Sequence, residues 1–454
     1  MTRYRPLEVL RRMATVIALA PALLAAPAYA IDIERVVSPG GIEAWLVRDP
    51  KTPIIAIEFV FEGGSALDPA GREGTANMMA ALLTEGAGEL DSTAYQERLA
   101  DDAISVGFST DRDAVFGSIR TLAENADSAW DLGRMALLEP RFDASAVERV
   151  RGQILAGLRR DLANPGAVAG QVFGRAVFEG HPYGRPPRGT LETVPTVTVE
   201  DMQGFRRARL ARDNLLVAVS GDIAPEALGP VLDRLFGDLP AKSEPFQMPL
   251  AQAKGGGEVV VVQRPTPQSI VNMGQQGIRR SDPDWFPAQI MNYVLGGGSF
   301  SSRLMEEIRV KRGLTYGVSS GLSAWDEGAL LTAGGSTNNP NAGAFVDLVK
   351  AEWQRMAEGG VTDEELADAK TYLTGSFPLQ FTTTSSIARV LLQVRRDDLG
   401  IDYLARRNAL IDAVTREDVA RVAKRLLDAD QLLTVIVGRP EGVKPTRVIE
   451  DWRG

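Results

Sequence analysis

Short apolar runs, bounded by glycine, proline and polar residues, open each half of the chain. Their length and their content of valine, isoleucine and phenylalanine are typical of strands. The pattern predicts strands over 44–47, 54–61, 258–263 and 270–274.

Longer stretches repeat their apolar residues with helical spacing. Val147, Val150, Ile154 and Leu158 predict a helix over 144–160, and a capping box from Thr362 to residue 365 opens another over 362–375. Strands and helices are mixed without strict βαβ alternation. The order predicts an α+β fold in which helices pack on one face of a mainly antiparallel sheet.

Two kinds of short sequence each occur twice, and the two copies are separated by nearly the same number of residues in both cases. Asp68-Pro precedes one helical run and Asp282-Pro another, 214 residues later, while Thr198 and Thr415 open matching Thr-x-Glu-Asp sequences 217 residues apart. Each threonine can cap a helix N-terminus, which the acidic residues also favour. The agreement indicates a tandem repeat of two similar domains of roughly 210 residues.

A segment rich in proline and glycine separates the two halves and is typical of a linker. The predicted organisation is a signal peptide over 1–30, an N-terminal domain over 31–240, a linker over 241–257 and a C-terminal domain over 258–454.

The first thirty residues have the pattern of a secretory signal. Four arginines precede an apolar run over 13–26, and Ala28-Tyr29-Ala30 is typical of a cleavage site. Pro21 and Pro27 break the run, which is shorter than the ~20 residues of a membrane span. We therefore expect an exported, periplasmic protein, cleaved after Ala30, with no membrane span.

Composition excludes several classes of function. The formal charge is −9, and removing residues 1–30, which carry +3, leaves −9 − 3 = −12, so binding to nucleic acid is not expected. The chain has no cysteine and a single histidine, His181. Disulfides, thiol catalysis and any site that needs two imidazoles from this chain are excluded.

The most specific motif lies at 296–318, where Gly-Gly-Gly-Ser-Phe-Ser-Ser-Arg-Leu is followed by Arg-Gly-Leu-Thr-Tyr. Together with Asp68-Pro and His181-Pro-Tyr-Gly-Arg185-Pro, it closely resembles the peptidase family M16 (pitrilysin/insulinase) in its short two-domain form. The resemblance spans residues 31 to 440.

The resemblance places a zinc site where this chain has no zinc ligands. Family enzymes bind zinc through the two histidines of His-x-x-Glu-His, whose glutamate is the general base, and through a glutamate on a later helix. These positions fall on Asn77, Ala80, Ala81 and Gly157. Alanine and glycine offer no donor atom, so this chain alone is expected to be no zinc peptidase and to hold no cofactor.

A second part of the family's site is retained. The resemblance implies that Arg309 and Tyr316 contact substrate carbonyls and help to stabilise the oxyanion. The alternative is structural: Arg309 would pair with Glu306 or Asp326, and Tyr316 would be a core aromatic residue.

Other motifs are weaker. Gly317–Gly321 matches G-x-S-x-G, but an extended segment is expected there, and His181 lies in a turn where a structural role is expected. The glycines at 296–298 lack the Lys-Ser/Thr of a phosphate loop. The segment 107–110 lacks the asparagine of the family's substrate strand, which leaves peptide binding there in doubt. The aspartates at 101, 102, 111 and 113 lack calcium-loop spacing and are expected to be solvated.

The working hypothesis is a non-catalytic subunit of an exported M16 peptidase complex. The partner would be an exported homologue that carries His-x-x-Glu-His and supplies zinc, the substrate would be a peptide, and this chain would contribute Arg309 and Tyr316. The alternative is a structural or peptide-binding homologue with no role in proteolysis.

Overall fold

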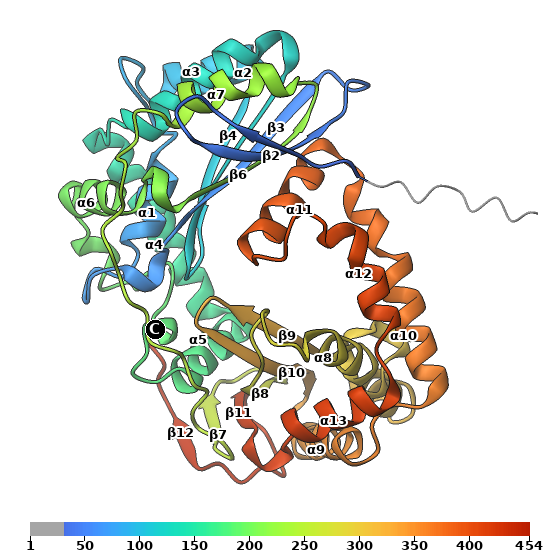
Figure 1. Ribbon diagram of the computed structural model, residues 1–454. Helices are drawn as coiled ribbons and strands as arrows, with labels where there is room; N and C mark the ends of the chain where they lie inside the picture. The colour runs from blue at the N-terminus through green and yellow to red at the C-terminus, as the bar shows by residue number, and fades with distance from the viewer. Residues whose placement is uncertain (1–30) are drawn as a thin grey trace, which may run out of the picture. The chain divides into compact units, whose positions relative to one another are not determined.

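The strands of this chain form two six-stranded sheets, seen in a computed structural model that describes residues 31–454 (Figure 1). The first sheet has the order β1-β2-β6-β3-β5-β4 and the second has the order β12-β7-β11-β8-β10-β9. The strands are β1 Glu34–Val37, β2 Glu43–Arg48, β3 Ile54–Glu62, β4 Ser105–Thr110, β5 Ala114–Leu122, β6 Leu215–Gly221, β7 Val259–Gln263, β8 Gln268–Gln276, β9 Thr315–Trp325, β10 Gly328–Asn338, β11 Leu433–Gly438 and β12 Arg447–Ile449.

Helices follow the strands in both halves and include the two that the apolar spacing predicts. The helices are α1 Thr75–Leu82, α2 Ser92–Asp101, α3 Ala126–Leu138, α4 Ala144–Ala163, α5 Pro165–Val177, α6 Val199–Arg209, α7 Pro225–Phe236, α8 Trp285–Asn292, α9 Ala342–Gly359, α10 Asp363–Gly375, α11 Thr384–Arg396, α12 Tyr403–Asp412 and α13 Arg416–Leu426. Thr198 and Thr415 do cap α6 and α13, each accepting a hydrogen bond from an aspartate amide at 3.1 Å.

The two sheets repeat the same plan. Strands β2, β6, β3, β5 and β4 of the first sheet match β7, β11, β8, β10 and β9 of the second, position by position. The parallel pairs β2–β6 and β7–β11 also match, and the central β3 and β8 pair antiparallel with both neighbours. The predicted fold class, a tandem α+β repeat with mainly antiparallel sheets, is confirmed.

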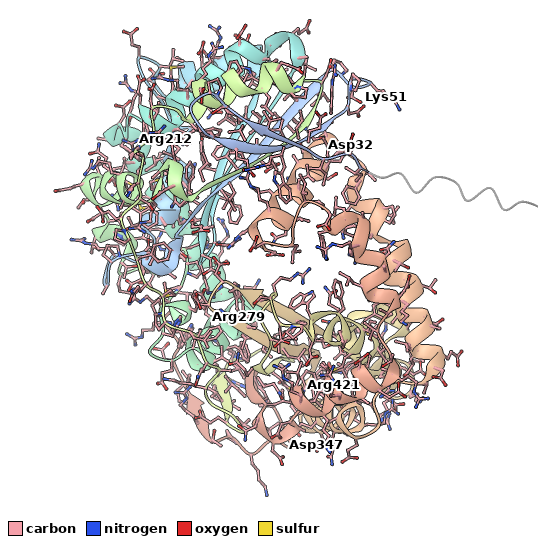
Figure 2. All side chains as sticks on the ribbon, in the orientation of Figure 1. Asp32, Lys51, Arg212, Arg279, Asp347 and Arg421 are labelled. Carbon is pink, nitrogen blue, oxygen red and sulfur yellow. The ribbon has the colours of Figure 1, made fainter. Side chains whose placement is uncertain are left out.

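Each sheet buries one face under helices of its own half. In the first sheet, the Phe59 ring of β3 packs against Phe236 of α7, with ring centroids 5.1 Å apart, in a core that also contains residues of α1, α3 and α4. In the second, residues of α8, α9 and α13 form the core, and Arg421 of α13, labelled in Figure 2, pairs with Asp284 at 2.8 Å.

The other face of each sheet is covered by a helix from the opposite half. Helix α11 packs on β3 and β6 (Figure 1). There Arg395 donates hydrogen bonds to the carbonyl oxygens of Glu43 and Val217. Helix α5 packs on β8 and β11, and its Phe173 lies against Gly274, where an added methyl group would come within 2.7 Å of the ring. The repeat alone did not predict this exchange.

Residues 241–257 contain no helix or strand. The predicted linker and domain boundaries stay predictions, and the predicted signal peptide at 1–30 lies outside the described residues. Within residues 31–454, no helix has both the length and the apolar character needed to cross a membrane.

Candidate functional site

Helix α1 carries three of the four positions that correspond to the zinc site. Its N-terminus is held by Asp68, which accepts hydrogen bonds from the amides of Gly74 (2.7 Å) and Ala76 (2.9 Å). Gly74 has φ +101°, a left-handed conformation that favours glycine. Burial of Met78, Met79 and Leu82 fixes the orientation of the helix. Asn77 and Ala81, one turn apart, therefore share its more exposed face, while Ala80 is buried.

The fourth position, Gly157, lies on α4, which packs against α1. A methyl group added at Gly157 would lie 3.5 Å from Nη2 of Arg188 and 3.8 Å from Nη2 of Arg160. Arg188 is held by Asp161 at 2.6 Å. Two guanidinium groups thus border the point from which a third zinc ligand would have to extend.

The residues at these four positions do not fit zinc. Alanine and glycine supply no ligand atom, the amide of Asn77 is a weak neutral one, and the nearby guanidinium groups oppose a divalent cation. Within residues 31–454, no three His, Cys, Asp or Glu side chains lie close enough together to hold a metal ion.

Arg309 and Tyr316 lie on either side of the turn that leads into β9. Arg309 belongs to the π-helix Met305–Val310, a class of distortion that is frequent at functional sites. Its guanidinium carbon lies 4.5 Å from the centroid of the Phe300 ring, on the preceding glycine-rich loop. Tyr316 is the second residue of β9, and 83% of its surface is exposed.

The structural alternative for these two residues is wrong. Glu306 lies within 3.9 Å of Lys311, and Asp326 pairs with Arg396 at 3.4 Å. Arg309 forms no ion pair with any carboxylate of residues 31–454. Tyr316 is too exposed to be a core residue, so neither side chain has the role that the structural alternative assigns to it.

The segment 107–110 forms the outer edge of the first sheet. It belongs to β4, which pairs with β5 on one side and with no strand of the described chain on the other. A cavity of about 480 Å³ lies beside it, lined by residues of β3, β4, β5 and α11, including Phe108, Phe116 and Arg389. Free backbone groups on an edge strand can pair with an extended peptide. Loss of the family's asparagine has therefore not removed the strand itself.

A charged cluster joins the two halves, and sequence reasoning missed it. Arg396 of α11 lies within 4 Å of carboxylate oxygens of Asp111, Asp113 and Asp326. Asp113 also accepts hydrogen bonds from the Tyr183 hydroxyl and, at 3.1 Å, from the Asp326 amide.

Burial raises the pKa of Asp113, although the Tyr183 hydrogen bond opposes this. The expectation that Asp113 is solvated is wrong, because its side chain is 5% exposed and lies 3.9 Å from Arg396. Asp111 is 43% exposed, but it too pairs with Arg396, from 285 residues away in the sequence. No local pattern could have indicated this contact.

The two remaining motifs have structural roles. Residues Gly317 and Gly321 both lie within β9, so the G-x-S-x-G match has no strand-to-helix turn. Nδ1 of His181 accepts a hydrogen bond from the Tyr183 amide (3.1 Å), and its Nε2 lies 2.8 Å from the Pro249 carbonyl oxygen. The histidine thus caps a short turn and ties it to the linker.

Comparison with known proteins places the chain in a family. The sequence model described as Insulinase (Peptidase family M16) matches residues 44–190, and the one described as Peptidase M16 inactive domain matches residues 196–373. A relative from Helicobacter pylori named "Non-peptidase homolog YmxG" is 29% identical over 340 residues, which cover 74% of this chain and 77% of the relative. A Bacillus subtilis relative, "Uncharacterized zinc protease YmxG", is 22% identical and covers 91% of this chain and 100% of its own length.

Solved structures agree with the sequence matches. A "peptidase M16 inactive domain" from Pseudomonas fluorescens superposes with a TM-score of 0.85 at 25% identity, covering 91% of this chain and 100% of that one. A structure named as a protease from Helicobacter pylori has a TM-score of 0.80 at 20% identity, covering 89% and 99%, and shows the shared fold. The chain belongs to peptidase family M16, and its residues 31–454 contain no group of His, Cys, Asp or Glu side chains that could hold a metal ion.

Proposed function

We propose that this chain is the non-catalytic subunit of an exported M16 zinc peptidase complex. The partner subunit, an exported M16 homologue with His-x-x-Glu-His, supplies zinc and the general base. This chain supplies Arg309 and Tyr316, which hold the peptide substrate and donate to the oxyanion that forms at the scissile carbonyl. The complex acts in the periplasm.

The observation that carries the proposal is that the polar groups of these two side chains have no hydrogen-bond or ion-pair partner within residues 31–454, although the Arg309 guanidinium stacks on Phe300. Arg309 has no carboxylate partner within residues 31–454, and 83% of Tyr316 is exposed. A guanidinium and a phenol are strong donors that, once a partner excludes water, favour a carbonyl oxygen whose negative charge grows in the transition state.

The second candidate is a structural or peptide-binding protein with no role in proteolysis. It is supported by β4, which is an open sheet edge beside a cavity of about 480 Å³. A chain that only binds peptides would need that edge and would not need Arg309 or Tyr316. The two proposals therefore differ in what they require of the second half of the chain.

The test begins with co-purification of the chain and its zinc-bearing homologue from the periplasm. Zinc content and peptide cleavage are then measured for each subunit and for the pair. We expect zinc in the partner only, with well below about half an equivalent of zinc bound per molecule of this chain. We also expect the pair to cleave peptides faster than either subunit alone.

Variants then separate the two candidates. Arg309→Ala and Tyr316→Phe in the reconstituted pair are each expected to lower kcat by about 10²-fold, the usual effect of removing one oxyanion donor. Lys311→Ala is the matched control, since Lys311 directly follows the π-helix and its half-exposed ammonium pairs with Glu307 at 2.6 Å and Glu306 at 3.9 Å. Full activity of both variants would refute the shared site and favour the peptide-binding role.

A further inference from the structure

A second cavity, of about 510 Å³, lies beside the degenerate zinc positions. Its walls come from the C-terminal part of α4, from α5 and from the loop 184–191, and residues 453 and 454 also line it. Leu158 and Arg188 of its lining adjoin Gly157, and Thr110, the last residue of the edge strand β4, lies at its border. The cavity thus begins where the open sheet edge ends.

The lining is strongly basic in a chain that is acidic overall. It contains two carboxylates, Asp111 and Asp161, and five arginines, Arg112, Arg175, Arg185, Arg188 and Arg453, an excess of 5 − 2 = 3 positive charges. The formal charge of the whole chain is −9. Asp161 pairs with Arg188, Asp111 pairs with Arg396, and Arg453 pairs with Asp451. Three arginines of the lining, Arg112, Arg175 and Arg185, are left for a ligand.

Three of these arginines are half-buried and form no ion pair with a carboxylate of residues 31–454. Arg112 donates to the Tyr183 carbonyl (2.9 Å), and Arg185 donates to the Asp68 carbonyl (3.1 Å). Arg175 lies over the Trp452 ring, with its guanidinium carbon 4.9 Å from the centroid. Each guanidinium thus keeps donor groups for a ligand, and half-buried donors of this kind favour an anion.

Two glycines of α5, one turn apart, leave room beside these guanidinium groups. A methyl group added at Gly170 would meet no atom within 4 Å, and one added at Gly174 would meet only Nη2 of Arg112, at 3.9 Å. Glycine inside a helix costs about 1 kcal/mol relative to alanine. Helix stability therefore does not explain these residues, whereas an open cavity wall does.

We propose that this cavity binds a carboxylate of an extended peptide. A peptide that pairs with β4 as an added strand would leave the sheet at Thr110, directly beside the cavity, and the arginines would then receive an acidic side chain or the terminal carboxylate. The site selects acidic peptides. Peptide binding at this site needs neither zinc nor a partner subunit. Its test is therefore independent of the shared-site proposal.

The binding is tested by isothermal titration calorimetry with the isolated chain and three N-acetylated peptides without a dye, because the carboxylate of a fluorescein label would itself be a candidate ligand. Amidated hexaglutamate carries side-chain carboxylates only, hexaglutamine with a free C-terminus carries a terminal carboxylate only, and amidated hexaglutamine carries neither. We expect at least one carboxylate-bearing peptide to bind about tenfold more tightly than amidated hexaglutamine, and which one does so identifies the source of the carboxylate. Equal binding of all three peptides would overturn the proposal.

Variants locate the binding in this cavity. Gly170→Leu fills the open space and is expected to abolish the preference for a carboxylate. The control is Gly152→Leu, which is expected to leave the preference unchanged. Gly152 is an exposed glycine of α4 outside the cavity, and a methyl group added there also meets no atom within 4 Å. Arg175→Gln removes one donor without removing a hydrogen bond of the fold and is expected to weaken binding about fivefold or more. Thermal unfolding of each variant shows whether it is folded. Wild-type preference in both Gly170→Leu and Arg175→Gln would place the binding elsewhere and refute the assignment.

Discussion

The guanidinium of Arg309 lies over the ring of Phe300, with its central carbon 4.5 Å from the ring centroid. Phe300 is itself 63% exposed, on the glycine-rich loop, so the contact does not serve to bury the ring. A planar guanidinium stacked on an aromatic face keeps its edge free to donate hydrogen bonds. The contact orients Arg309 and leaves it available to a ligand.

This arrangement predicts that Phe300 is a positioning residue for the proposed complex. Phe300→Ala is expected to lower kcat of the reconstituted pair about two- to fivefold, since an exposed cation–π contact contributes about 0.5–1 kcal/mol, whereas Phe300→Tyr keeps the wild-type rate. In the Arg309→Ala background, Phe300→Ala is expected to have no further effect. Independent effects of the two substitutions would show that Phe300 does not act through Arg309.

Gly157 makes α4 less stable than it could be. Gly157→Ala is expected to raise the free energy of unfolding by about 0.5–1 kcal/mol, because alanine favours the helix and the added methyl group makes only ordinary contacts, the nearest at 3.5 Å. Urea unfolding measures the change, and Gly152→Ala on the same helix is the matched control with a similar expected gain. A loss of stability confined to Gly157→Ala would mean that the Arg188 side chain cannot tolerate the methyl group.

Arg396 is expected to hold the two halves of the chain together. Its side chain is 14% exposed and faces three carboxylates, of which Asp113 is 5% exposed. Arg396→Gln leaves Asp113 without its cation and is expected to lower the free energy of unfolding by about 2–4 kcal/mol. Arg406→Gln, on α12, is the control, because Arg406 and its partner Asp402 are both at least half exposed and lie 2.7 Å apart, a pair worth less than about 1 kcal/mol. Similar effects of both substitutions in denaturant unfolding would contradict this role.

Asp68 links stability to pH. Burial raises its pKa from the ordinary 3.8 to about 7, against the opposing effect of its two amide hydrogen bonds. Between pH 4 and 7 the folded chain therefore holds a proton that the unfolded chain has released. The stability from Asp68 is present in full below the unfolded pKa and is lost as the pH rises towards the folded pKa.

The measurement is the difference in unfolding free energy between the wild type and Asp68→Asn at several pH values. As the pH rises from about 4 to about 7, the wild type is expected to lose stability relative to the variant, by at most about 1.4 kcal/mol per pH unit. A difference that stays constant, or that grows in favour of the wild type, would show that the carboxyl is ionised throughout this range.

Much of the fold follows from local pattern. The capping residues Thr198 and Thr415, the predicted helices at 144–160 and 362–375, and the apolar strands all reflect interactions between residues close in sequence. The exchange of α5 and α11 between the halves was not predictable in this way. An amphipathic helix shows that it will cover an apolar surface, but its sequence does not say which of two similar sheets it covers.

Some properties of the candidate site also follow from the sequence alone, whereas others follow only from the tertiary structure. Residue type by itself determined that Asn77, Ala81 and Gly157 cannot form the family's zinc site, because alanine and glycine offer no donor atom and the asparagine amide is only a weak neutral ligand. Only the tertiary structure decided that Arg309 pairs with no carboxylate of residues 31–454, that Arg396 lies near three aspartates and that three arginines without such a partner line a cavity beside Thr110. Those properties depend on contacts between charged residues that are far apart in the sequence. Such contacts follow no periodic pattern along the chain and could not be predicted from it.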